Sequence, residues 1–537
     1  MNIAKVRPWS VGALGALAAA GGCTLLIGVD AGGDKPAGTG GGTSSTSGPS
    51  SATASGVSSV SSSTTTSTTG SGSGGGTGGG MPGGGEVWGK GFQTIGADLP
   101  SPTGIAVDKQ GNAYVIGYYG GTITFAQGPG GSLTSAGGSA CSYFLASFDK
   151  AGTYRWGTSF DAIGNQCQVS DFSSVAVDAQ GNVYFAGDLS IDSVQVGPTN
   201  YPNPSGGTND ALLLASYTST GTLRWSRVDA NAYPTGLGAD SKGNLLVTGV
   251  GAPAIGAMPP GVGTMFLAKF EAATGTGYWS SVYGDAAGQP KGTQSPNGLV
   301  IDAADDVLIT GSFLPSIKLD TTSFVTLGGS DIFLAKFYTG EMWNATVVWA
   351  NRYGGAKNDS GYSVAVDPSG AISLVGTIAG PADLGGGNMV VNPLSYTADG
   401  FVARYEGVGT FSWAKTFGGT LGVTSQQVAS DVNGNVIVAG AGAGSFDFGG
   451  GGVLTPAGPN PNVYLAKFDT KGKYHWAKLF GDTNGQQYPV VATDPTTHEV
   501  VLAFANQGKV NLGKDTITAM PLGNAHMSNL VVARFNP

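Results

Sequence analysis

One phrase is written seven times between residue 86 and the C-terminus. Each copy starts with a tryptophan strand, continues into a small-residue run that ends in aspartate, and closes with an apolar run such as FLAKF. The tryptophans are Trp88, Trp156, Trp225, Trp279, Trp349, Trp413 and Trp476. The aspartates are Asp108, Asp178, Asp240, Asp302, Asp367, Asp431 and Asp494. A strand-rich unit that recurs at a period of roughly 65 residues predicts a solenoid or a propeller, because such a unit buries its faces only against its neighbours.

Two hairpins can be placed within each unit. The aspartate run leads through an Asp-x-x-Gly-Asn turn, as at 108–112, into a β-branched run such as YVIG. Farther on, stretches such as AKFDTKGKYHW at 466–476 join the apolar run to the next tryptophan. Short strands joined by Asp, Gly and Asn are typical of tight hairpins. Each unit therefore predicts four antiparallel strands, which we name a (ending in Asp), b, c (the apolar run) and d (with Trp).

The two ends of the repeating region lack complementary strands. The region opens with a d strand at 87–92 that no c strand precedes, and it ends with a c strand at 530–535 that no d strand follows. An open stack would expose both edges to aggregation. We therefore predict an all-β, seven-bladed propeller over 86–537, closed when 87–92 supplies strand d to a last blade made by the C-terminal unit.

The repeated phrase resembles a known family. Units of the form AKFDxxGxxxW, followed by a loop and AVDxxGNVYVTG, resemble the bacterial SBBP-type β-propeller repeat over essentially all of 86–537. The c–d hairpin also resembles the tryptophan-docking motif of quinoprotein dehydrogenases. The third and fourth units depart from the pattern by inserting residues before their Trp, and the fourth has Asp305 and Asp306 in place of Gly and Asn. The resemblance implies a propeller of bacterial extracytoplasmic proteins without a defined catalytic activity.

The N-terminus carries an export signal. An apolar stretch from Val11 to Ala20 follows two basic residues, is too short to span a bilayer and suits the core of a signal peptide. The AGGC sequence ending at Cys23 resembles a bacterial lipobox, although that family prefers Leu where this chain has Ala20. The resemblance implies a lipoprotein-type signal peptide over 1–23 with lipid on Cys23. Cleavage without lipidation and an uncleaved anchor are the alternatives.

The segment 24–85 has the composition of a tether. From Ala31 to Gly85 it consists mainly of Gly, Ser and Thr, so no apolar burial offsets the entropy of ordering it. We predict a disordered linker, with O-linked sugars as a further use of its hydroxyls. In bacterial lipoproteins Asp after the lipidated Cys favours inner-membrane retention. Here that residue is Thr24, so we expect an exported protein anchored by lipid in the envelope, at the outer membrane or cell surface.

Charge excludes one class of partner. The net charge is −9 and only 11% of the residues are charged, without a cluster of Lys and Arg. Nucleic-acid binding needs such a cluster to neutralise phosphates. We therefore expect no nucleic acid as partner, and a monomer whose surface is polar but largely uncharged.

The seven aspartates allow two interpretations. They could form a carboxylate ring at one mouth of the channel and attract Ca²⁺, or each could accept N–H groups within its own turn. We favour the turn, because Ca²⁺ takes six or more oxygens and the chain has no compact D-x-D-x-D-G loop. The prediction is thus no metal and no cofactor, with Ca²⁺ as the alternative. The seven tryptophans are likewise interpreted as packing between blades, with an aromatic platform for sugar or quinone as the alternative.

Two cysteines remain after Cys23. Strands c (143–148) and d (154–160) form a hairpin between Cys141 and Cys167, so we expect both residues beyond its open end. In an exported chain this predicts a disulfide, which would contribute roughly 3 kcal/mol in the chain-entropy model. Two free thiols are the alternative.

Catalytic motifs are missing from the sequence. The chain has three histidines, all in the last two units, and lacks G-x-S-x-G, H-E-x-x-H, P-loop and C-x-x-C patterns. Nucleophilic, zinc and nucleotide chemistry need such groups. We predict that the protein is not an enzyme and has no catalytic residues.

The binding surface is predicted from strand direction. Alternating strands place the short a–b and c–d turns on one face and the long b–c and d–a loops on the other, and variable loops usually carry function. We name these the short-turn face and the long-loop face. The candidate ligand-binding residues are Asn165, Gln166, Asp285, Asn297, Asn358, Asp359, Gln486 and Tyr488. The sequence favours a non-enzymatic, surface-tethered propeller that binds an extracellular polysaccharide or an envelope protein. A quinoprotein- or lyase-type enzyme and a structural envelope protein are the alternatives.

Overall fold

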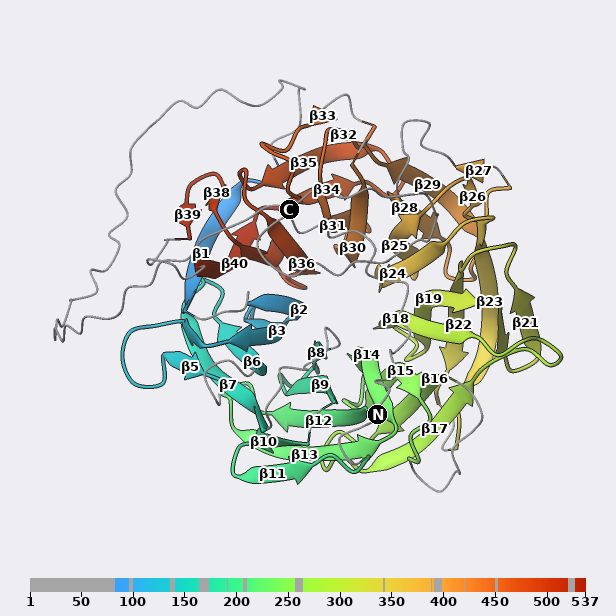
Figure 1. Cartoon of the computed structure of the whole chain (residues 1–537), viewed down its shortest axis with the longest axis horizontal. Coiled ribbons are helices and arrows are strands. Elements are labelled where there is room, and N and C mark those ends of the chain that lie inside the picture. Colours follow the sequence, from blue (N-terminus) through green and yellow to red (C-terminus); the bar gives the residue numbers. More distant parts are fainter. Residues whose placement is uncertain are drawn as a thin grey trace, which may run out of the picture. The chain divides into compact units, whose positions relative to one another are not determined.

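The repeating region folds into seven β-sheets. The computed structural model describes residues 83–95, 100–135, 141–163, 173–190, 192–205, 210–255, 264–340, 343–387, 389–390, 398–419, 421–449, 453–519 and 527–537. All of them belong to one compact unit, and every regular element among them is a β-strand. No helix among the described residues could cross a membrane. The sheets are arranged as blades around a central axis (Figure 1).

Each blade contains strands a, b, c and d in antiparallel order. Blade 1 consists of β2 (Ser101–Val107), β3 (Ala113–Gly120), β6 (Cys141–Phe148) and β7 (Tyr154–Ile163). Blade 2 consists of β8 (Ser173–Val177), β9 (Val183–Leu189), β12 (Ala211–Tyr217) and β13 (Leu223–Ala230). Blade 3 consists of β14 (Ala232–Ala239), β15 (Leu245–Gly251), β16 (Met265–Phe270) and β17 (Gly277–Tyr283). Blade 4 consists of β18 (Thr293–Ile301), β19 (Val307–Leu314), β22 (Asp331–Tyr338) and β23 (Thr346–Gly355).

The remaining blades follow the same order. Blade 5 consists of β24 (Asp359–Val366), β25 (Ile372–Ile378), β28 (Asp399–Tyr405) and β29 (Phe411–Phe417). Blade 6 consists of β30 (Val423–Ser430), β31 (Val436–Gly442), β34 (Asn462–Phe468) and β35 (Tyr474–Phe480). Blade 7 consists of β36 (Gln486–Thr493), β37 (Val500–Asn506), β40 (Met527–Phe535) and β1 (Glu86–Ile95). The predicted seven-bladed propeller is confirmed.

Blade 7 closes the ring as predicted. Strand β1 pairs antiparallel with β40 from Glu86↔Phe535 to Ile95↔Met527, so both strands are longer than the sequence indicated. Figure 1 shows the blue N-terminal strand beside the red C-terminal one. The backbone continues the pairing outward, since Asn536 N–H donates to Gly85 O at 2.7 Å. In blade 7 the segments at Gly85 and Asn536 thus lie side by side where the other blades have a c–d turn.

Further hairpins lie in the b–c connections, where the sequence predicted only long loops. They are β4 (Thr122–Thr124) with β5 (Ser132–Thr134), β10 (Ser193–Val196) with β11 (Thr199–Pro202), β20 (Ser316–Leu319) with β21 (Thr322–Val325), β26 (Ala382–Asp383) with β27 (Met389–Val390), β32 (Phe446–Asp447) with β33 (Val453–Leu454), and β38 (Lys509–Asn511) with β39 (Thr516–Thr518). Strands β4, β10 and β26 pair with strand d of the preceding blade. Those pairings cover edges that would otherwise be open to aggregation.

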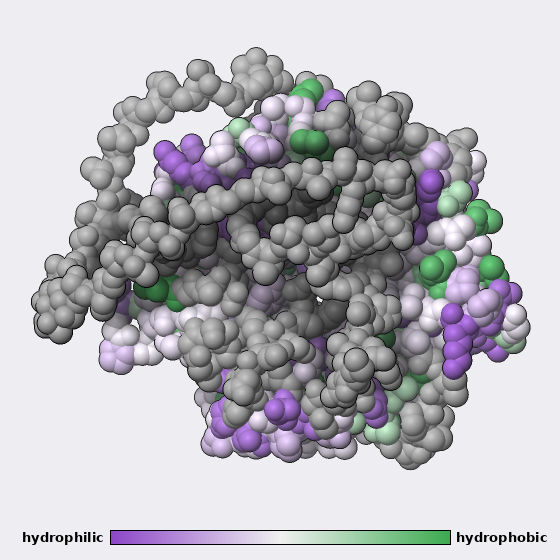
Figure 2. Space-filling view, viewed as in Figure 1, coloured by the Kyte–Doolittle hydropathy of each residue, from purple (hydrophilic) through white to green (hydrophobic). Residues whose placement is uncertain are grey.

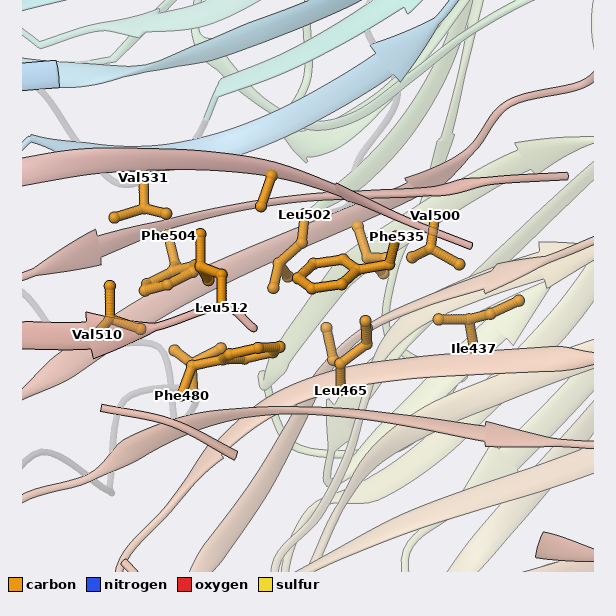
Figure 3. Close-up of a cluster of buried hydrophobic side chains, with 14 of the residues drawn as sticks. Ile437, Leu465, Phe480, Val500, Leu502, Phe504, Val510, Leu512, Val531 and Phe535 are labelled. Atoms are coloured by element: carbon orange, nitrogen blue, oxygen red, sulfur yellow. The ribbon is translucent and has the colours of Figure 1, made fainter. Parts of the chain in front are cut away.

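The core lies between blades. Strands b and c are almost wholly buried, and their apolar side chains meet those of the neighbouring blade. Between blades 6 and 7, Phe480 and Leu465 face Phe504 and Phe535 (Figure 3). Burying such side chains contributes about 1.5–3 kcal/mol each. Each blade therefore depends on its neighbours, as expected of a repeat fold.

The tryptophans fasten each blade to the next. Trp88 donates its indole N–H to Lys150 O at 2.9 Å, and its ring covers Gly152 so closely that a Cβ there would lie 2.7 Å away. Equivalent bonds join Trp156 to Ser219 O, Trp225 to Ala272 O and Trp413 to Thr470 O. The turn glycine is needed both for its positive φ and for this close approach. The interpretation of the tryptophans as packing between blades is confirmed at these positions.

Candidate functional site

The seven aspartates terminate strand a on the short-turn face. Asp108 Oδ1 accepts the N–H groups of Gln110 at 2.9 Å and Asn112 at 2.8 Å, and Oδ2 accepts the Asn112 side-chain amide at 2.8 Å. Asp178, Asp240 and Asp431 make the same three bonds. The other three aspartates, Asp302, Asp367 and Asp494, cap variants of the turn. The predicted turn role is confirmed.

In blade 4 the left-handed turn position is held by an aspartate. Asp305 has φ of 63°, where the other turns have glycine or, in blade 7, His498. The Asp305 carboxylate accepts hydrogen bonds from Ser241 N–H at 2.7 Å and Ser241 Oγ at 2.6 Å, across the boundary to blade 3. An acidic side chain tolerates the left-handed region better than most, and here it also links two blades.

Five aspartates are paired with a cation on strand c. The pairs are Lys269–Asp240 at 3.1 Å, Lys336–Asp302 at 2.6 Å, Arg404–Asp367, Lys467–Asp431 at 3.0 Å, and Arg534–Asp494 at 2.8 Å. The cation occupies one position, the Lys or Arg of the FLAKF run. The run is visible in the sequence, but the pairing of its cation with the aspartate is not, because the two residues lie about 30 to 40 positions apart.

The pair in blade 7 is the most deeply buried. The side chains of Arg534 and Asp494 are fully buried, and Arg534 also contacts Glu499 at 2.9 Å. Burial alone would raise the pKa of Asp494, but N–H groups of Thr496 and Thr497 and the guanidinium outweigh it, so the pKa lies below its usual value. The carboxylate therefore stays ionised throughout the neutral range.

Blades 1 and 2 use a tyrosine in place of the cation. Their strand c has Ser147 and Ser216 at the Lys or Arg position. Tyr114 donates its hydroxyl to Asp108 Oδ2 at 2.8 Å, and Arg155 Nη1 donates to Tyr114 at 3.3 Å and to Ser147 at 2.9 Å. Burial raises the pKa of Tyr114 to about 12, although the hydrogen bond from Arg155 acts to lower it.

The relay in blade 2 repeats that of blade 1. It consists of Tyr184, Asp178, Arg224 and Ser216, with Tyr184 donating to Asp178 at 2.8 Å. The pairing of serine on strand c with tyrosine on strand b is the sequence signal that could have revealed both relays. In blades 1 and 2 a tyrosine hydroxyl thus bonds the aspartate directly, and the cation, an arginine of strand d, bonds the tyrosine.

The aspartates are not an open ring of acids. Each is committed to its turn and to a cation or tyrosine, and the described residues contain no group of three or more His, Cys, Asp or Glu side chains able to hold a metal ion. Neighbouring turns also lie against some of them, since a Cβ on Gly111 or Gly434 would come within 2.7 Å of Asp494 or Asp367. This donor set fits turn capping and ion pairing, and it does not fit the six or more converging oxygens that Ca²⁺ takes.

The ligand candidates belong to the long-loop face. Asn165, Gln166 and Cys167 lie outside the described residues, as does Cys23. Cys141 is the first residue of β6 rather than a position beyond the strand, and the disulfide prediction is left to the undescribed residues. The other candidates lie near what we name the corners, where the beginning of strand c meets the beginning of strand a in the next blade.

The corner between blades 6 and 7 is a network of amides. Gln486 is fully buried and accepts the Asn462 amide at 2.5 Å, while its own amide donates to Asn506 at 3.2 Å and Asp482 at 3.3 Å. The corner between blades 3 and 4 repeats this arrangement with Gln294, Thr264 and Asp285. The candidates Gln486 and Asp285 thus hold loops in place.

The remaining candidates differ in exposure. Asp359 is buried, with 1% exposed, and accepts N–H groups of Gly355 at 2.7 Å and Ala379 at 3.2 Å. Asn297 donates to Gly361 O at 2.8 Å across the boundary between blades 4 and 5. Tyr488 has φ of 56° within β36. Asn358 is exposed, and its oxygen accepts Ser330 N–H at 3.1 Å.

A pocket of about 290 Å³ lies between blades 7 and 1. Its lining includes Lys90 and Phe92 of β1, Phe125, and Tyr154. The rings of Phe125 and Tyr154 stack on each other at 5.2 Å, so their faces are already engaged. The pocket was not expected from the sequence, because it is formed by the β4–β5 hairpin and the closure strand together.

These features define a class of protein. Seven four-stranded antiparallel blades, closed by pairing of the first and last strands, make the chain a seven-bladed β-propeller. Residues 91–118, from β1 through β2 into β3, match the SBBP family model, described as a beta-propeller repeat. The resemblance inferred from the repeated phrase is thereby confirmed. No curated protein matches the chain in sequence.

Solved structures with a similar fold have varied functions. The propeller of Dos1 has a TM-score of 0.39 and 10% identity, covering 82% of this chain and 94% of its own. A quinohemoprotein alcohol dehydrogenase from Pseudomonas putida has a TM-score of 0.37 and 12% identity, with coverages of 84% and 76%. A gluconolactonase from Xanthomonas campestris has a TM-score of 0.30 and 12% identity, with coverages of 67% and 86%. At this level of similarity none of these functions transfers to the chain.

Proposed function

We propose that this propeller is a non-enzymatic binding protein whose long-loop face takes an extracellular polysaccharide or envelope protein. The observation that carries the proposal is the contrast between its repeated and unrepeated residues. The described Asp turns recur from blade to blade, and each aspartate is engaged in its turn and with a cation or a tyrosine. Ligand binding specific to this chain therefore falls to residues that differ between blades, and these residues are concentrated in the long loops.

The exposed side chains of those loops supply the proposed contacts. Gln289, Asn358 and Asn484 lie exposed at three different corners, whereas Asp285, Asp359 and Gln486 are engaged in their own networks. Amide side chains both donate and accept hydrogen bonds, which suits sugar hydroxyls and peptide groups alike. Figure 2 shows hydrophilic and hydrophobic residues intermixed over the described surface on the side in view.

A binding screen tests the proposal. The full chain would be applied to arrays of bacterial glycans and envelope proteins, and the triple variant Gln289→Ala, Asn358→Ala, Asn484→Ala should lose most of the binding. A matched triple variant on exposed positions of the short-turn face, Gln110→Ala, Thr220→Ala, Asn433→Ala, should bind as the parent does. A blank screen together with activity in a redox or polysaccharide-cleavage assay would favour the enzyme instead.

We also propose that lipid on Cys23 anchors the protein in the bacterial envelope. Support comes from the short apolar stretch and the lipobox-like sequence that ends at this residue. Cys23→Ser should release the protein from the membrane fraction while leaving the fold of 86–537 intact. An unchanged membrane fraction for this variant would rule the anchor out.

A further inference from the structure

The corner between blades 6 and 7 shows how two side chains meet at this place in the fold. Gly481 follows strand d of blade 6, and a Cβ on it would lie 2.0 Å from Asn462 Nδ2 and 1.8 Å from Gln486 Oε1. The two amides bond each other at 2.5 Å. One side chain is the donor and the other the acceptor, so the buried contact is satisfied.

The corner between blades 4 and 5 has the same geometry with two acids. Gly354 occupies the place of Gly481, and a Cβ on it would lie 2.5 Å from Asp331 Oδ1 and 2.9 Å from Asp359 Oδ2. Asp331 begins β22 as Asn462 begins β34, and Asp359 begins β24 as Gln486 begins β36. Two ionised carboxylates facing the same glycine contain no donor.

The hydrogen bonds of Asp331 leave one oxygen unaccounted for. Its Oδ2 accepts from Arg352 Nη1 at 2.8 Å and from Leu327 N–H at 3.3 Å. Its Oδ1 is buried and has no hydrogen-bond partner among the described residues. An unsatisfied buried oxygen costs about 1–3 kcal/mol. Gly354 faces both this oxygen and Asp359 Oδ2, so Asp359 is the candidate for the missing donor.

Asp359 has donors from the backbone but no cation. Both of its oxygens accept N–H groups, from Gly355 and Ala379. The guanidinium that the described residues place at this corner, that of Arg352, is bonded to Asp331. With both acids ionised, the corner would therefore bury two negative charges against one positive charge, which is unfavourable in a medium of low polarity.

We propose that Asp331 and Asp359 share one proton, which Asp359 carries and donates to Asp331 Oδ1, and that this proton joins blades 4 and 5 on the long-loop face. The proton makes the acid pair equivalent to the amide pair of blades 6 and 7. It also brings the summed charge of Asp331, Asp359 and Arg352 to zero. Loss of the proton leaves one net negative charge buried between the blades.

The pKa of Asp359 agrees with this arrangement. Burial, aided by the charge of Asp331, raises it to about 7 in spite of the N–H bonds from Gly355 and Ala379. Burial likewise raises the pKa of Asp331, although Arg352 opposes the rise.

Other charged groups on the surrounding elements do not replace the proton. Lys357 in the preceding loop is exposed, and Asp383 of β26 accepts the N–H groups of Gly385 and Gly387. Asp399 begins β28 opposite Ile378 and adds a further acid on that side. None of the three supplies a positive charge to the buried corner.

The sign of the pH dependence follows from the raised pKa. An unfolded or opened Asp359 titrates near its ordinary value, about 4. Between about pH 4 and pH 7 the closed corner binds more protons than the open one, so rising pH destabilises the closed corner across that interval. The equilibrium constant for opening should rise by up to about tenfold per pH unit and level off above pH 7.

Hydrogen exchange of the full chain tests the proposal. Exchange of the Gly355 and Ala379 amides, corrected for the intrinsic effect of pH, should accelerate from pH 5 to pH 7 in the parent protein. In Asp359→Asn, whose amide can donate to Asp331, this acceleration should vanish. The control Asp482→Asn lies at the 6–7 corner, where hydrogen bonds outweigh burial and lower the pKa of Asp482, so it should leave the acceleration unchanged.

Two double variants make the outcome decisive. Asp331→Asn with Asp359→Gln copies the amide corner and should abolish the acceleration even if Asp359→Asn folds poorly. Asn462→Asp with Gln486→Glu should create a new acceleration at the 6–7 corner. Equal pH dependence in the parent and the amide variants would overturn the shared proton.

Discussion

The two faces of the propeller use the same kinds of side chain for different purposes. On the short-turn face an aspartate at the end of strand a binds the same turn in each blade and meets a cation or a tyrosine, as at Asp494 with Arg534. On the long-loop face a side chain at the start of strand a is buried as well, but it is Gln294, Asp359 or Gln486 in different blades. One face repeats an aspartate with a cation or a tyrosine, whereas the residues of the other face vary from blade to blade.

The difference has a geometric cause. A short turn fixes the backbone N–H groups around its aspartate, and the carboxylate that accepts them is also bonded by a cation or a tyrosine. A long loop can supply donors or acceptors from many positions. Several kinds of side chain can therefore make the hydrogen bonds of a corner, so residues on the long-loop face can change without loss of the fold.

The largest effect is expected at the buried pair of blade 7. Arg534→Met leaves Asp494 and Glu499 without their cation, and removing one partner of a buried pair typically costs about 3–5 kcal/mol. The free energy of urea unfolding measures the loss. Lys336→Met, at a more exposed pair, is the matched control and should cost less. Equal losses would contradict the role assigned to burial.

Closure of the ring gives the next effect. Trp88→Ala removes a buried indole and its bond to Lys150, and the loss should be about 3 kcal/mol. Trp413→Ala removes the same bond at a more exposed site and serves as the control. A lower melting temperature for Trp413→Ala than for Trp88→Ala would contradict the greater weight given to the buried indole.

Two turn glycines distinguish the cost of a left-handed backbone from the cost of a close contact with a neighbouring blade. Gly434 and Gly370 both have positive φ, but a Cβ on Gly434 would lie 2.7 Å from Asp367 Oδ2, whereas a Cβ on Gly370 would meet nothing within 4 Å. Gly370→Ala should cost about 1 kcal/mol for the left-handed backbone, and Gly434→Ala about 2 kcal/mol or more. Denaturant midpoints give the difference. Equal costs would mean that adjacent blades do not press on the turn.

The two faces should respond to pH with opposite sign. The pKa of Asp431 is lowered, because bonds from Asn435 and Lys467 outweigh the effect of burial. Its contribution is present above its unfolded pKa and is lost as pH falls through the lower folded value. The 4–5 corner instead loses stability as pH rises toward 7. Unfolding from pH 2 to pH 8 should therefore show a maximum, and Asp359→Asn should remove only the decline on its high-pH side.

The tyrosine relays give the smallest effect. Tyr114→Phe removes one hydroxyl from Asp108, while the three bonds within the turn remain. The loss should be about 1 kcal/mol in urea unfolding. Tyr119→Phe, whose hydroxyl bonds Ser159 instead, controls for the loss of a buried tyrosine hydroxyl elsewhere in the blade. A loss above that of Lys336→Met would show that the relay bears more of the charge pairing than the cations do.

The amino-acid sequence by itself determined the repeat, the four strands of each unit, the closing strand and the role of the turn aspartates, because these depend on local patterns that recur seven times. It did not reveal the Lys and Arg partners, the relays of Tyr114 and Tyr184, the added hairpins or the paired acids Asp331 and Asp359. Those features join residues from different strands or different blades. Strand pairing within a blade and packing between neighbouring blades bring such residues within a hydrogen-bond distance, and burial between two blades raises the pKa of Asp359.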